Sequence, residues 1–177
     1  MKKLLIIAII CAMSATANAQ IKFGGHFGVP VGDLSEFYSF TLGADLYYMF
    51  GHNPDGFLKF GVATGYINYF GSTVDILGQD VDIDNASFIP IAGAVRITIL
   101  KFITFGPDFG YGFGVSNGID GGFYWRLVGG IDFGNAVEVN LFYHSISADG
   151  GGEGSSNTSF NTLGIGLLFQ LGKNKKE

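Results

Sequence analysis

The feature that most constrains this chain is a period-two alternation of apolar with small or polar residues, which recurs in eight segments. Such alternation is typical of β-strands whose two faces meet different surroundings. The segments are 20–29, 39–50, 57–70, 88–100, 102–114, 123–133, 136–145 and 160–171. Each has roughly the length that a tilted transmembrane strand requires. The pattern therefore predicts eight consecutive strands of one kind.

All charged residues within these segments fall on the face opposite the large apolar side chains. They are Lys22, Asp45, Lys59, Arg96, Asp108, Arg126, Asp132 and Glu138, four of each sign. A Lys or Arg facing lipid at mid-bilayer costs about 2–4 kcal/mol, so the apolar face is the one expected to meet lipid. The charged face is also rich in glycine, which suits the narrow lumen of an eight-stranded barrel. We call these eight residues the lumen charge network and expect them to pair inside a sealed lumen.

Composition separates the two classes of barrel that this pattern allows. Aromatic residues make up 15% of the chain and charged residues only 14%, and there are 29 glycines. A transmembrane barrel needs a lipid-facing apolar band with aromatic girdles. A soluble lipocalin-like barrel would instead point its bulky faces into a small interior and leave the glycine-rich faces outside. We therefore predict an all-β, eight-stranded antiparallel up-and-down transmembrane β-barrel.

The N-terminus has the pattern of a secretory signal peptide. A basic start is followed by an apolar run from Leu4 to Met13 and by the small-residue site Ala17-Asn18-Ala19. About ten apolar residues are too few to cross about 30 Å of hydrocarbon as a helix. We expect residues 1–19 to be removed together with Cys11, which leaves the exported chain without a disulfide.

The rest of the chain is expected to form one domain with a short tail. Residues 20–172 form the outer-membrane barrel, and 173–177 form a basic periplasmic tail. The longer connections between strands are 30–38, 71–87, 115–122 and 146–159, and the shorter ones are 51–56, 100–101 and 134–135. Small bacterial barrels have short periplasmic turns and longer extracellular loops. This places both termini in the periplasm of a Gram-negative bacterium.

The longer connections carry acidic residues and contain no Lys or Arg. The acidic residues are Asp33, Glu36, Asp75, Asp80, Asp82, Asp84, Asp120, Asp149 and Glu153. Around the dipeptide Leu77-Gly78, apolar and polar residues alternate, which predicts a hairpin that extends above the membrane. Weak divalent-cation binding near Asp80, shared with lipopolysaccharide phosphates, is the alternative. The segment lacks the sixth-position Gly and twelfth-position Glu of an EF-hand, so no metal site is expected.

Two local features of the strand segments lead to specific predictions, one at Pro107 and one for Asp108 and Arg126. Pro107 lies within a strand segment, where it cannot donate to the hydrogen-bond ladder of a closed barrel, so we expect a bulge or kink there. Asp108 and Arg126 lie on adjacent segments at similar distances from the connection between them. We therefore expect these two residues to form an ion pair inside the barrel.

Three stretches carry a resemblance to a known family. They are Ile89-Pro90-Ile91, Gly106-Pro107-Asp108-Phe109-Gly110-Tyr111-Gly112 and Leu163-Gly164-Ile165-Gly166-Leu167-Leu168-Phe169. In this pattern of glycine, proline and aromatic residues the chain resembles the outer membrane protein beta-barrel domain family, small barrels of the OmpX and OmpA-membrane-domain type. The resemblance implies an outer-membrane location and assigns no common activity.

The end of the chain also resembles a sorting signal. Gly166, Phe169 and Leu171 are similar to the signal that the barrel-assembly machinery recognises, although six residues follow Leu171. The resemblance implies that this machinery is a partner during biogenesis. Outer-membrane lipid and lipopolysaccharide are the other expected partners, together with an extracellular partner of unknown identity. The acidic composition disfavours nucleic acid, and we expect a monomer.

Three functions remain open. The favoured one is a structural or surface-interaction barrel with a sealed, charge-matched lumen and acidic extracellular loops. A narrow pore or small-solute channel is the alternative, although a ring of charges of one sign would favour it more. A lipid-A-modifying enzyme is the third, because His144-Ser145-Ile146-Ser147 resembles the His and Ser of small lipid A deacylase barrels. Ile146 replaces the expected Ser, so we expect no catalytic, cofactor-binding or metal-ligating residue.

Overall fold

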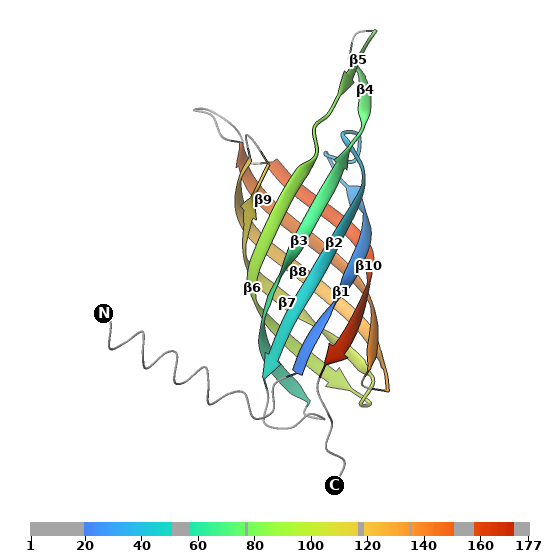
Figure 1. Ribbon diagram of the computed structural model, residues 1–177, viewed down its shortest axis with the longest axis vertical. Helices are drawn as coiled ribbons and strands as arrows, with labels where there is room; N and C mark the ends of the chain where they lie inside the picture. Colours follow the sequence, from blue (N-terminus) through green and yellow to red (C-terminus); the bar gives the residue numbers. More distant parts are fainter. Residues whose placement is uncertain are drawn as a thin grey trace, which may run out of the picture.

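The computed structural model describes residues 20–50, 57–76, 78–116, 119–134, 136–150 and 158–171. Eight long antiparallel strands close into one barrel, and two short strands form a separate hairpin (Figure 1). The barrel strands are β1 (Gln20–Val31), β2 (Tyr38–Phe50), β3 (Leu58–Gly71), β6 (Ala86–Ile99), β7 (Ile103–Gly114), β8 (Ile119–Phe133), β9 (Val137–Gly150) and β10 (Thr158–Leu171). The predicted fold class is confirmed. The signal peptide and the basic tail lie outside the described residues.

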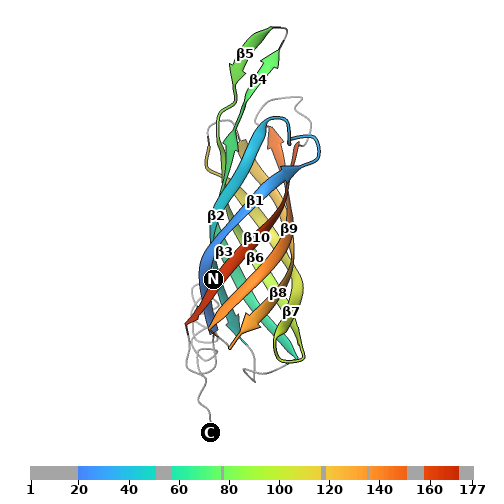
Figure 2. The same ribbon diagram turned by 90° about the vertical axis from the view of Figure 1, so that its right-hand side faces the viewer.

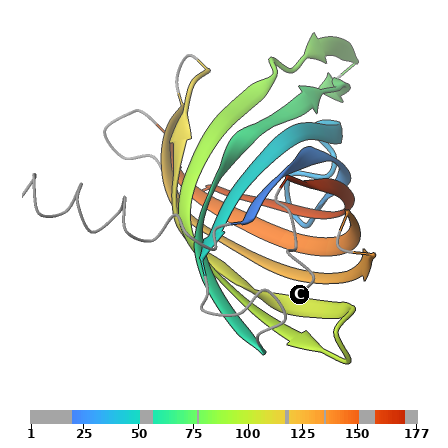
Figure 3. The same ribbon diagram turned by 60° about the horizontal axis from the view of Figure 1, so that its bottom comes forward.

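Each strand pairs with its neighbours in the chain, and β1 pairs with β10 to close the ring. The closing ladder runs in register from Ile21 opposite Leu171 to Val31 opposite Asn161. Seen from the lower end of Figure 1, the tilted strands curve around one lumen (Figure 3). Closure leaves no free strand edge in the wall. No helix in the described part of the chain is long and apolar enough to cross a membrane.

The two faces of the strands are sorted as the alternation predicts. Most large apolar side chains on the predicted outer face are exposed, between 36% for Ile103 and 64% for Leu141. The alternate positions are buried or half-buried, as in β1, where Lys22, His26 and Gly28 are buried between exposed residues. Six residues of the lumen charge network are buried, and Lys59 and Asp132 are half-buried. The barrel thus has an apolar outside and a charged inside.

The connections sort into the two predicted ends of the barrel. One end holds the start of β1 and the end of β10, the turn at 100–102, and residues Gly134 and Ala136 between β8 and β9. The tight turn at Leu100 and Lys101 has both residues at positive φ, 53° and 66°, as a narrow hairpin requires. The other end, here called the loop end, holds the connection 32–37 and the protruding hairpin. Its strands β8 and β9 extend beyond the predicted segments, because Ile119 pairs with Gly150.

The predicted hairpin forms above the loop end. Strands β4 (Thr73–Ile76) and β5 (Gln79–Asp82) pair only with each other, with Val74 opposite Val81. They continue β3 and β6 beyond the barrel wall (Figures 1 and 2). Gly78 has a φ of 82°, a backbone conformation that glycine adopts more easily than other residues. The hairpin prediction is confirmed.

Of the bulge or kink predicted at Pro107, the bulge does not form. The β6–β7 ladder keeps the same register on both sides of it, with Ala94 opposite Asp108 and Ile97 opposite Phe105. The ladder omits only the intervening pairs, while the β7–β8 ladder runs through Pro107 opposite Leu127. The missing ladder bonds near Pro107 are partly replaced by Arg96, whose Nη1 donates to the carbonyl oxygens of Val95 and Pro107 at 2.9 and 3.3 Å. A side chain from the lumen thus stabilises the interrupted ladder without a shift in register.

Candidate functional site: the barrel lumen

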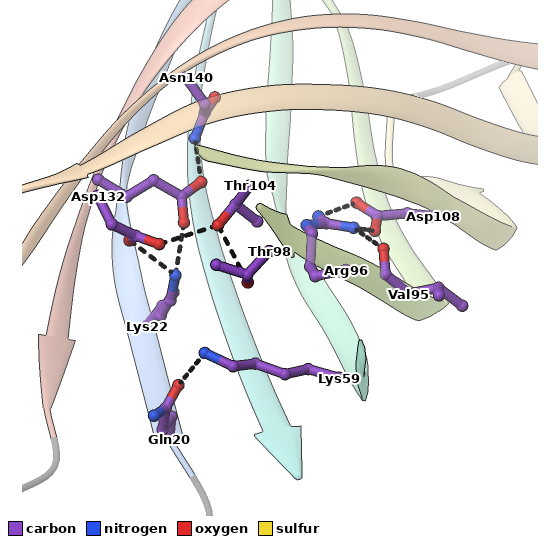
Figure 4. Close-up of polar contacts among 11 residues, drawn as sticks. Gln20, Lys22, Lys59, Val95, Arg96, Thr98, Thr104, Asp108, Asp132 and Asn140 are labelled. Atoms are coloured by element: carbon purple, nitrogen blue, oxygen red, sulfur yellow. Dashed lines mark hydrogen bonds and ion pairs between the residues drawn. The ribbon is translucent and has the colours of Figure 1, made fainter. Parts of the chain in front are cut away.

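The lumen near the closing ends of β1 and β10 is crossed by ion pairs from Lys22. Its Nζ lies 2.5 Å from Glu138 Oε2 on β9 and 3.2 Å from Asp132 Oδ1 on β8 (Figure 4). β9 and β8 are two and three strands from β1 around the ring, so these bonds pass through the lumen and do not join neighbouring strands. Thr104 donates to Asp132 at 2.9 Å, and Asn140 donates to Glu138 at 3.2 Å. One cation therefore contacts two carboxylates, and each carboxylate also accepts a hydrogen bond from a neutral side chain.

Lys59 lies beside this cluster. Its Nζ donates to Gln20 Oε1 at 3.3 Å (Figure 4). A cavity of about 10 Å³ lies among Lys22, Lys59, Arg96 and Glu138. That volume is about enough for one water molecule. Side chains thus occupy this part of the lumen almost completely.

The middle of the lumen holds a fork of Arg96 on Asp108. Nη1 and Nη2 of Arg96 donate to the two carboxylate oxygens at 2.5 and 3.1 Å. Tyr47, across the barrel on β2, donates its hydroxyl to the same carboxylate at 3.0 Å. The guanidinium carbon also lies 5.1 Å from the centre of the Tyr47 ring. Two parallel hydrogen bonds between a guanidinium and a carboxylate fix the relative orientation of the two groups and are stronger than a single neutral hydrogen bond.

A second charged group centres on Asp45. Arg126 Nη1 lies 2.8 Å from Asp45 Oδ1, and His26 Nδ1 lies 2.8 Å from Asp45 Oδ2. The guanidinium of Arg126 stacks on Phe142, 4.0 Å from the ring centre. Arg126 and Asp45 come from β8 and β2, so this pair also spans the lumen.

The predicted pair of Asp108 with Arg126 does not form among these contacts. The two residues are directly opposite each other on β7 and β8, as the sequence suggested. Each carboxylate and guanidinium instead meets a different partner, Arg96 for Asp108 and Asp45 for Arg126. Long side chains in a narrow closed barrel reach across it as easily as along its wall. Register alone therefore does not determine the ion pairs.

Among the described residues, the lumen toward the loop end contains packed aromatic rings in place of ion pairs. Tyr69 is fully buried, and its hydroxyl lies 2.9 Å from His144 Nε2 and 3.0 Å from Thr162 Oγ1. Its ring packs edge-on against Phe88 and Phe160, with centroid distances of 6.0 and 5.2 Å. These inward aromatic residues were not among the lumen residues predicted from the sequence. Continuing the period of two through Tyr69 and Phe88 would have found them.

The space around individual glycines indicates how tightly side chains fill the lumen. A β-carbon added at Gly43 would overlap the His26 ring and the carbonyl oxygen of Tyr66, whereas one at Gly129, on the outer face, would meet nothing within 4 Å. We expect Gly43→Ala to lower the free energy of unfolding by about 1–3 kcal/mol, because overpacking forces side-chain shifts. Gly129→Ala should change it by less than about 0.5 kcal/mol. Urea titration of both variants checks this, and equal stabilities would contradict a filled lumen.

The acidic residues of the connections are distributed over the loop end. Asp75, Asp80, Asp82 and Asp84 are exposed on or beside the hairpin. Asp82 accepts a hydrogen bond from Thr73 at 2.7 Å, and Asp75 accepts one from the Gly78 amide at 2.7 Å. Among the described residues, no group of three or more His, Cys, Asp or Glu side chains could hold a metal ion. The Asp149 side chain and Glu153 lie outside the described residues.

Comparison with known proteins rests on structure alone. No family model and no curated protein matches the chain. Among solved structures, the Yersinia pestis outer membrane protein Ail in a phospholipid bilayer nanodisc aligns with a TM-score of 0.54. The alignment covers 86% of this chain and 98% of Ail at 14% identity. The chain has the barrel fold of Ail.

A second structure of Ail gives the same result. It is the crystal structure in complex with the heparin analogue sucrose octasulfate, with a TM-score of 0.52 and 12% identity over 86% of this chain and 97% of that one. Identities this low establish a shared fold and nothing about ligands. The fold expected from the family resemblance is confirmed, namely a small barrel of the outer-membrane type.

Proposed function

We propose that this protein is an integral outer-membrane barrel with a sealed lumen, whose acidic loop end takes part in surface interactions. The observation that carries the proposal is the set of ion pairs that cross the lumen from Lys22 and Arg126. They leave a cavity of only about 10 Å³ among the charged groups near Lys22. A conducting pore would need a continuous hydrated path, which side chains in this position obstruct.

The outer face supports residence in a membrane. Large apolar residues are exposed on all eight barrel strands, including Phe23, Leu46, Phe109 and Ile165. A water-soluble protein rarely exposes such a continuous apolar surface. A bilayer removes that surface from water, and the closed ladder satisfies the backbone as lipid requires. Contacts with lipid and lipopolysaccharide, insertion by the barrel-assembly machinery and a monomeric state belong to the same proposal.

The loop end favours partners other than polyanions. The longer connections contain no Lys or Arg, and Asp33, Glu36, Asp84 and Asp120 are exposed there. The Ail structure with sucrose octasulfate shows that a barrel of this fold can hold a polysulfate. The carboxylates of this chain would repel such a ligand. We therefore propose a neutral or cationic partner for this surface.

The arrangement around His144 does not favour hydrolase chemistry. Its side chain is fully buried in the lumen, and its Nε2 lies 2.9 Å from the Tyr69 hydroxyl. A nucleophile needs its base within hydrogen-bond reach and open to substrate. Ser145 follows on the same strand and therefore projects from the opposite face. We propose that His144 is a structural part of the lumen.

Cysteine labelling of whole cells tests the proposed orientation. Ser35 lies in the connection at the loop end and Ala136 in a turn at the opposite end, and both are exposed. We expect a membrane-impermeant maleimide to label Ser35→Cys on intact cells, and to label Ala136→Cys only after the outer membrane is permeabilised. The protein without an introduced cysteine is the control. If only Ala136→Cys were labelled on intact cells, the barrel would have the opposite orientation.

A further inference from the structure

The loop end contains an apolar cavity that the lumen charge network does not line. Its volume is about 280 Å³. The side chains that define it are Leu34, Phe37, Tyr38, Ile83, Ile119 and Phe160. They come from the connection after β1, the segment between β5 and β6, and strands β2, β8 and β10. An apolar cavity of about 150 Å³ is enough for benzene, so this one has room for an aromatic ring with a short alkyl chain.

Four of the cavity residues lie in connections or at the start of β8. Each of them has an acidic residue next to it in the sequence. The pairs are Asp33-Leu34, Glu36-Phe37, Ile83-Asp84 and Ile119-Asp120. In every pair the apolar side chain is half-buried and the acidic one is exposed. The apolar member of each pair lines the cavity, and the acidic member next to it in the sequence is exposed. We call the three that lie in connections, Asp33, Glu36 and Asp84, the acidic rim; Asp120 follows Ile119 on strand β8 and projects from the opposite face.

The rim and the cavity favour the same class of ligand. Three carboxylates with no Lys or Arg in the surrounding connections create a negative potential that attracts cations. Inside the cavity, Tyr38 and Phe160 lie with ring centroids 5.8 Å apart. Aromatic faces bind aryl groups by stacking and also attract cations. An anion would meet repulsion at the rim, and a fully polar cation would gain nothing from the apolar wall.

We propose that this cavity binds small amphiphilic cations, meaning an aryl or short alkyl group that carries an ammonium. The apolar group lies between Phe37, Ile83 and Phe160, and the ammonium remains at the acidic rim. Such binding goes beyond the proposed surface role and does not depend on which side of the membrane the loop end faces. It also does not require an open lumen.

Calorimetric titration of the barrel in zwitterionic nanodiscs tests this proposal. The probes are 4-phenylbutylammonium, 4-phenylbutanol and 4-phenylbutyrate, with empty nanodiscs as the blank. We expect saturable binding of one ammonium per barrel, roughly tenfold or more tighter than binding of the carboxylate. No saturable binding of the ammonium would overturn the proposal, and so would equal affinities for the ammonium and the carboxylate.

Two kinds of variant locate the site. Ala148→Phe and Leu34→Trp each fill the cavity, one from a barrel strand and one from a connection, and both should abolish binding. Asp33→Asn/Glu36→Gln/Asp84→Asn should weaken ammonium binding roughly tenfold and leave the alcohol unaffected. The control Asp75→Asn/Asp80→Asn/Asp82→Asn removes the same charge from the hairpin and should bind like the parent.

A boiled-versus-unboiled gel shift verifies that each variant is folded. Loss of binding is thereby distinguished from misfolding. Parent-like binding by both filled variants would place the ligand elsewhere and overturn the proposal. An equal loss in the hairpin control and the rim variant would show general charge attraction without a site, which also overturns it.

Discussion

Replacing Arg126 with Leu is expected to lower the free energy of unfolding by about 3–5 kcal/mol, because it leaves the buried Asp45 carboxylate without its guanidinium partner. Arg126 is only 1% exposed and Asp45 only 7%, so bulk water does not solvate the carboxylate that the substitution leaves behind. His26 would be the remaining partner of Asp45, at 2.8 Å. Urea unfolding in phospholipid vesicles, followed by the unboiled gel shift, measures the change.

Two double variants distinguish the observed ion pairs from the pair suggested by strand register. Asp45→Leu/Arg126→Leu removes both charges of one pair and should be more stable than Arg126→Leu alone. Asp108→Leu/Arg126→Leu leaves Arg96 without its carboxylate partner and Asp45 without its guanidinium partner, and should be less stable than the single variant. The reverse order of the two double variants would show that Asp108, not Asp45, balances Arg126.

Replacing Ile165 with Arg is expected to have the second large effect. Ile165 lies in the middle of β10 and is 54% exposed on the apolar outer face. An arginine at mid-bilayer on the lipid face costs about 2–4 kcal/mol, so we expect that loss in unfolding free energy or a failure to insert. Folding yield and urea titration in vesicles provide the measurement.

Leu171 is the matched control on the same strand. It is exposed to a similar extent, 57%, but lies at the strand end, where an arginine costs only about 0–1 kcal/mol. A barrel in water would tolerate both arginines equally. Equal, small effects of Ile165→Arg and Leu171→Arg would therefore contradict a membrane location.

The strands and their faces follow from the sequence because each depends on local alternation. A one-residue slip would expose a residue such as Arg96 to lipid, so register is strongly specified wherever charges mark the inner face. The ends of β8 and β9 were less predictable. Their extension to Ile119 and Gly150 depends on pairing beyond a register shift, and the glycine-rich sequence there gives little alternation.

The ion pairs were not predictable from the sequence, although the lumen residues were. Barrel closure brings β8 opposite β2, and the partner of Arg126 depends on how the strands are staggered around the ring. Pro107 illustrates the same limit. A local rule predicts a bulge, but Arg96 donates hydrogen bonds to carbonyl oxygens at the interrupted ladder from inside the barrel. Both outcomes depend on three-dimensional contacts across the lumen.

Planar-bilayer conductance tests most directly whether charge pairs seal the lumen. The refolded barrel is added to the bilayer, and insertion is established independently by the boiled-versus-unboiled gel shift. We predict no stable conductance steps from the inserted barrel, because Lys22, Arg96 and Arg126 bind carboxylates inside it. Stable single-channel steps from the parent protein would contradict the sealed lumen and favour a narrow pore.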